Sequence, residues 1–162
     1  PGSKIQASDL YGTAIRPAPG TSTTVVIAED IGIGPALGFI ERHPEAVSLA
    51  LLGGQYGVPG RLVPSRFYLP AFAHCAIAGV GMLESLEVPS RIALAEDRPG
   101  VYEGDIFALL GLYLSELDPA TRDQLGVVAF MPWGRSGTTP TFGALDAVAG
   151  SVDWVELPSR RG

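Results

Sequence analysis

Residues 24–40, TVVIAEDIGIGPALGFI, decide the fold class of this chain. The β-branched, apolar run at the start of the segment is typical of a buried strand, and Gly32 and Gly34 permit a sharp turn after it. Pro35 then opens an apolar pattern with helical spacing. A strand, a glycine turn and a helix form the first half of a nucleotide-binding βαβ unit, whose helix N-terminus faces a phosphate.

The rest of the chain repeats this alternation of apolar strands and helices. We expect strands at 23–27, 47–52, 91–95, 127–131 and 152–155, with a short edge strand at 67–69. Helices are expected at 35–41, 76–86, 106–117 and 142–150, and a short helix follows Asp118 and Pro119. The sequence therefore predicts an α/β fold: a mostly parallel, roughly five-stranded sheet of Rossmann type, covered by helices on both faces.

Composition limits the function classes. The chain has 162 residues, 46% of them hydrophobic, which is enough for one domain over 23–162 after a polar arm or linker at 1–22. The net charge of -6 and the lack of a basic cluster argue against nucleic acid and membrane partners. A single cysteine leaves no ligand set for an iron–sulfur cluster. No secretory signal pattern opens the chain, so a cytoplasmic location is expected.

In parallel sheets, ligands bind beyond the carboxyl ends of the strands. The residues at those ends form the candidate cofactor site, and no metal site is expected. After the first strand they are Asp30, Gly32, Ile33, Gly34 and Pro35; after the second, Gly53 and Gly54; after the strand at 127–131, Met131, Pro132 and Trp133.

Three segments resemble the pyridine-nucleotide-binding half of ferredoxin reductase-like flavoproteins, most of all the electron-transfer subunit of dihydroorotate dehydrogenase. They are VVIAEDIGIGPALGFIE, the region around EVPSRIALAEDRPGVYEGDI, and VVAFMPW. The resemblance implies an NAD(P)H-binding domain of a flavin-dependent oxidoreductase acting in electron transfer. Its cofactor would be NAD or NADP, and FAD would lie on a partner domain or subunit. The homo-oligomeric state is left open.

The chain also departs from that family. Ala28, Glu29 and Asp30 stand where the family has a glycine triplet, and Phe130 and Met131 replace a Cys-Gly pair beside the nicotinamide. Residues 1–22 are too short for the flavin-binding barrel. Two carboxylates near a pyrophosphate would weaken binding, because a like-charge contact near 4 Å costs about 1–4 kcal/mol. The alternative function is therefore a degenerate, non-catalytic domain that serves as a binding or assembly module.

Several residues have both a functional and a structural interpretation. Glu29 and Asp30 are candidates for ribose hydroxyls or a cation, or Asp30 caps the next helix. His74 and Cys75 suggest a metal or nucleophile, but Cys75 fits better as a core residue. The loop WGRSGTTP carries Arg135 and is either an anion site or an ordinary polar loop.

Overall fold

The computed structural model describes residue 16, residues 23–132 and residues 152–157 of the chain. Their main feature is a parallel sheet with strands in the order β6-β5-β2-β1-β7-β8. The strands are β1 (Thr23–Glu29), β2 (Val47–Gly53), β5 (Ser90–Leu94), β6 (Tyr102–Glu103), β7 (Leu125–Pro132) and β8 (Val152–Leu157).

The strand order is Rossmann-like. Without the two-residue edge strand β6, the sheet runs third, second, first, fourth, fifth in chain order, which is the doubly wound arrangement. All five strands expected from the sequence are present, and the predicted α/β class with a mostly parallel sheet is confirmed.

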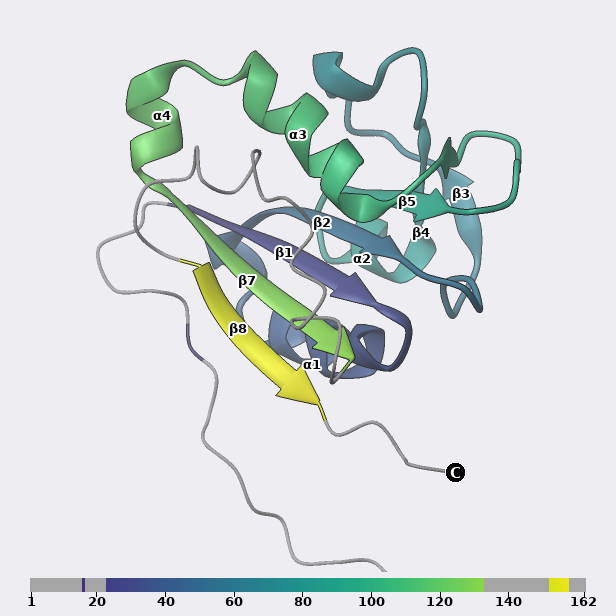
Figure 1. Ribbon diagram of the computed structural model, residues 1–162, viewed down its shortest axis with the longest axis horizontal. Helices are drawn as coiled ribbons and strands as arrows, with labels where there is room; N and C mark the ends of the chain where they lie inside the picture. Colours follow the sequence, from purple (N-terminus) through teal and green to yellow (C-terminus); the bar gives the residue numbers. More distant parts are fainter. Residues whose placement is uncertain (1–15, 17–22, 133–151, 158–162) are drawn as a thin grey trace, which may run out of the picture.

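Helices cover both faces of the sheet, as Figure 1 shows for α1 (Ile33–Arg42) and α3 (Ile106–Glu116). Alternate residues of β1, β2, β5 and β7 supply two separate apolar cores. Val26 and Phe130 belong to the core under α1, and Ile27 and Met131 to the core under α3. Burial of these four strands on both faces explains why they read as continuous apolar runs.

Helix ends follow the expected capping chemistry. The Asp105 carboxylate accepts hydrogen bonds from the backbone N–H groups of Phe107 and Ala108, both at 2.8 Å, and so caps α3. Asp118 accepts from the Thr121 N–H at 3.1 Å at the start of α4 (Pro119–Asp123), where Pro119 takes the first position. The prediction of a short helix after Asp118 is confirmed.

The region between β2 and β5 differs from the prediction. The expected helix at 76–86 is wrong, because Ala78–Val80 forms strand β4, antiparallel to β3 (Leu62–Pro64), and only α2 (Gly81–Ser85) is helical. Gly79 lies close to Ser90 and Glu84 and has no room for a side chain, a tertiary contact that the local pattern does not reveal. The expected edge strand at 67–69 is also wrong. The predicted helix at 142–150 and nearly all of the arm at 1–22 lie outside the described residues.

Candidate ligand-binding cleft at the carboxyl edge of the sheet

A cleft lies where three neighbouring parallel strands end. Glu29 of β1 is level with Gly53 of β2, and Gly53 is level with Ala93 of β5. Beyond these positions the chain forms an open cleft of about 550 Å³. Its lining residues are Glu29, Asp30, Gly54, Gln55, Ala95, Gly104 and Asp105.

Asp30 connects the ends of β1 and β2. Its Oδ1 accepts hydrogen bonds from the backbone N–H groups of Gln55, at 2.8 Å, and Tyr56, at 3.4 Å. Asp30 has a φ of 46°, a conformation that aspartate adopts more readily than most residues. Gly54 has a φ of 129° and lies against the Asp30 carboxylate, which leaves no room for a Cβ atom. Asp30 makes no side-chain hydrogen bond as a helix cap, so its carboxylate holds the loop after β2 instead.

The glycine turn after β1 offers little to a phosphate. A Cβ atom on Gly32 would overlap the carbonyl oxygen of Phe130, so Gly32 serves the close contact between this turn and β7. The Ile33 N–H already donates to the Asp30 carbonyl, and Pro35 has no N–H. Gly34 is exposed, with no atom within 4 Å of the position of a Cβ. Two positions of the first turn, Ile33 and Pro35, therefore offer no N–H group to a phosphate.

The cleft has an acidic wall. Glu29 is only 2% exposed, although it lies at the end of a strand, and Asp30 and Asp105 line the same space. Among the described residues, the lining includes neither lysine nor arginine. A negatively charged ligand group in the cleft would be repelled by these carboxylates. The repulsion rises as water is excluded, because the local dielectric falls. This chemistry suits hydroxyl or amino groups better than phosphates.

The remaining predicted site residues are dispersed. A Cβ atom on Gly53 would lie 2.5 Å from Ile106 Cγ2 and 2.6 Å from the Ala93 carbonyl oxygen, so this glycine permits close packing. Met131 is 3% exposed and belongs to the core under α3. Pro132 is the last residue of β7, and Trp133, like Arg135, lies outside the described residues.

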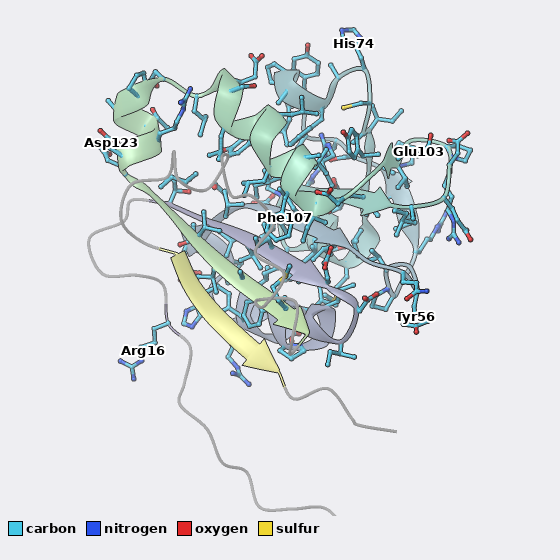
Figure 2. The ribbon with its side chains drawn as sticks, in the orientation of Figure 1. Arg16, Tyr56, His74, Glu103, Phe107 and Asp123 are labelled. Carbon is cyan, nitrogen blue, oxygen red and sulfur yellow. The ribbon has the colours of Figure 1, made fainter. Side chains whose placement is uncertain are left out.

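His74 and Cys75 do not form a reactive site. His74 projects outward at the edge of the molecule, away from the cleft (Figure 2). Burial raises the pKa of the Cys75 thiol, with a smaller opposing effect from the charge of Arg91. A raised pKa lowers the thiolate fraction and hence the nucleophilicity at neutral pH. Within the described ranges, no three His, Cys, Asp or Glu side chains gather as metal ligands.

Five lining residues were absent from the predicted cofactor site: Glu29, Gln55, Ala95, Gly104 and Asp105. Sequence signals for them exist, since Asp105 directly precedes the apolar helical pattern at 106–117, as an N-cap does. The sequence does not show that β5 pairs with β2. This pairing brings the start of α3 next to the end of β1.

No helix in the part of the chain that the structure describes is long and apolar enough to cross a membrane. Comparison of the chain with protein-family models, with curated proteins and with solved structures found no match.

Proposed function

We propose that this chain is a binding module that takes the nucleoside part of a small ligand into the acidic cleft through the ligand's hydroxyl groups. One observation carries the proposal: the cleft lies beyond the carboxyl ends of β1, β2 and β5 in a Rossmann-like sheet, where such folds bind their ligands. A space of about 550 Å³ falls within the usual range for small-molecule sites.

The carboxylates support recognition of hydroxyl groups. A carboxylate only accepts hydrogen bonds, and it accepts them strongly from the paired hydroxyls of a ribose. Glu29 forms part of the wall at the end of β1. Asp30 and Asp105 are held in place by the hydrogen bonds that they accept from backbone N–H groups. A ligand therefore meets preorganised acceptors, which lowers the entropic cost of binding.

The same carboxylates select against phosphates. Each phosphate near Glu29 or Asp30 would meet repulsion of about 1–4 kcal/mol at 4 Å, depending on the dielectric. The usual compensation is reduced, because Gly32 packs on the Phe130 carbonyl and the Ile33 N–H is used within the turn. We therefore expect the affinity to fall as phosphates are added to a nucleoside.

The second candidate function is the NAD(P)H-binding domain of a flavin-dependent oxidoreductase, with FAD on a partner domain or subunit. The strand order and the position of the cleft favour it. The residues at the end of β7 do not fit a nicotinamide, since the side chains of Phe130 and Met131 are buried in the two cores. We derive no hydride transfer from them. If a dinucleotide binds, NAD is favoured over NADP, because the lining residues that the structure describes offer no cation for the additional phosphate.

Isothermal titration calorimetry with adenosine, AMP, ADP, NADH and NADPH separates the two candidates. Our proposal expects adenosine to bind at least about fivefold more tightly than ADP, a difference near 1 kcal/mol. Tighter binding of ADP and NADH than of adenosine would support the oxidoreductase domain and contradict the proposal. No saturable binding of any of these ligands would contradict both.

The variant Glu29→Gln tests the electrostatic argument with little change of shape. ADP should bind at least about fivefold more tightly to this variant, because one repulsive charge is removed. Glu116→Gln is the matched control: Glu116 ends α3, roughly 16 Å along the helix from the cleft at its N-terminus. An equal change in both variants would attribute the effect to the overall charge instead of the cleft.

A further inference from the structure

A second, smaller cavity of about 160 Å³ lies beside β5, apart from the acidic cleft. The loop after β3, the 3₁₀ turn η3 (Pro70–Phe72) and the residues before β4 surround it, and Arg91 of β5 also lines it. Ser65 and Arg66 contribute polar groups to its wall, and the rest of the lining is mainly apolar: Phe67, Tyr68, Leu69, Phe72, Ala73, Ala76 and Ile77.

Arg91 is an unusual residue for the interior of a parallel strand. It is 3% exposed, and its guanidinium stacks over the Phe72 ring, 5.8 Å from the ring centroid. Its Nη1 donates to the Ser90 carbonyl and its Nη2 to the Phe67 carbonyl, both at 2.6 Å. Its Nε is buried with no hydrogen-bond partner.

No carboxylate among the described residues forms an ion pair with Arg91. Burial lowers the pKa of Arg91, and the field of Glu84 opposes that effect. Glu84 itself is already engaged, since its oxygens accept hydrogen bonds from the Ser65 hydroxyl at 2.7 Å and the Arg66 N–H at 3.2 Å. Arg66 also lies 3.6 Å from Glu87, so its charge is shared between two acids. Arg91 is the cation of this cavity that lacks a direct counterion within the described structure.

We propose that this cavity binds a small monocarboxylate with an apolar body, held by Arg91. A buried guanidinium is stabilised most by an anion that is buried beside it. A carboxylate can accept two parallel hydrogen bonds from the edge of the guanidinium that carries Nε and Nη2. An engineered apolar cavity of about 150 Å³ holds benzene, so the size of this cavity suits a body of about six carbon atoms.

The chemistry of the cavity selects a carboxylate over a phosphate. A single uncompensated cation balances one negative charge, and a second charge would remain buried against phenylalanine, leucine and alanine side chains. The Nε atom is covered in the structure, so the cavity wall shifts when the carboxylate binds.

Titration of the ¹⁵N-labelled chain with benzoate, followed by NMR of the backbone amides and of the Arg91 Nε–H, tests the proposal. Benzyl alcohol, of nearly the same shape but uncharged, and inorganic phosphate are the comparison probes. We expect saturable benzoate shifts in residues 65–77 and at Arg91, with benzoate binding at least about tenfold more tightly than either comparison probe.

Arg91→Lys is the informative variant, because it keeps the positive charge and removes the planar pair of donors. Benzoate should bind at least about tenfold more weakly to it, while benzyl alcohol changes little. Equal affinity for benzoate and benzyl alcohol, tighter binding of phosphate, shifts confined to residues 54–56, or unchanged benzoate binding in Arg91→Lys would each overturn the proposal. If Arg91→Lys does not fold, the comparison of the three probes on the unmodified chain still decides.

Discussion

The acidic cleft and the Arg91 cavity differ in the exposure and the hydrogen bonding of their charged side chains. In the cleft, Asp30 and Asp105 are exposed enough to meet a ligand, yet each accepts two backbone hydrogen bonds from the protein. In the cavity, Arg91 is almost fully buried, yet one of its donors has no acceptor. A carboxylate at the edge of a sheet readily takes a structural role, because the N–H groups of nearby loops donate hydrogen bonds to it. A buried cation with an unused donor is costly and needs another explanation.

The strongest test of this comparison concerns the glycines of the turn after β1. Gly32→Ala should lower the free energy of unfolding by about 3 kcal/mol, since the new Cβ would overlap the Phe130 carbonyl and the backbone must shift. Gly34→Ala is the matched control and should stabilise the protein by about 0.5 kcal/mol, because its Cβ meets open space in a helix. Urea unfolding of both variants measures the difference. Equal effects would mean that Gly32 has no special packing role and is available to a ligand.

A smaller effect is expected from Asp105, the carboxylate of the cleft that begins α3. Asp105→Ala should cost about 1 kcal/mol of stability, because two backbone donors lose their acceptor. Asp105→Asn keeps an acceptor oxygen and should cost much less. Chemical denaturation distinguishes the two. Similar losses in both variants would show that the charge of Asp105, and not its capping geometry, stabilises the cleft.

The smallest effect concerns Asp118, an exposed cap outside both regions. Hydrogen bonds from the Thr121 hydroxyl, at 2.6 Å, and from the Thr121 N–H lower the pKa of the Asp118 carboxyl. A lowered folded pKa means that the stabilisation is complete above the unfolded value of about 3.9 and is lost as the pH falls below it. The stability difference between the unmodified chain and Asp118→Ala, measured from neutral to acidic pH, should therefore shrink in acid. A difference that stays constant would show that the cap acts without its charge.

The sequence was a good guide to elements whose signals are local. Apolar β-branched runs marked all five major strands, and Asp118 with Pro119 marked α4. It failed at 76–86, where alternating small and apolar residues fit a helix as well as a strand. The tertiary contact of Gly79 with Ser90 and the pairing of β4 with β3 decided between them.

Glycines near the cleft show the same limit. In sequence, Gly32, Gly53 and Gly54 read as a surface that approaches a phosphate. In the fold, they are the positions where Phe130, Ile106 and Asp30 come too close for a Cβ atom. A glycine in the sequence indicates that something lies close to the backbone at that position. The sequence does not say whether a ligand or another part of the protein makes that contact.

By itself, the sequence determined the fold class, the order of the strands along the chain and the position of charged residues at strand ends, because these follow from local periodicity and turn chemistry. Only the tertiary structure decided which strands are neighbours, and therefore which carboxylates share the cleft. It also decided that Arg91, an ordinary strand residue in the sequence, is a buried cation beside a cavity. Burial and counterions are set by segments far apart in the chain, so no local pattern encodes them.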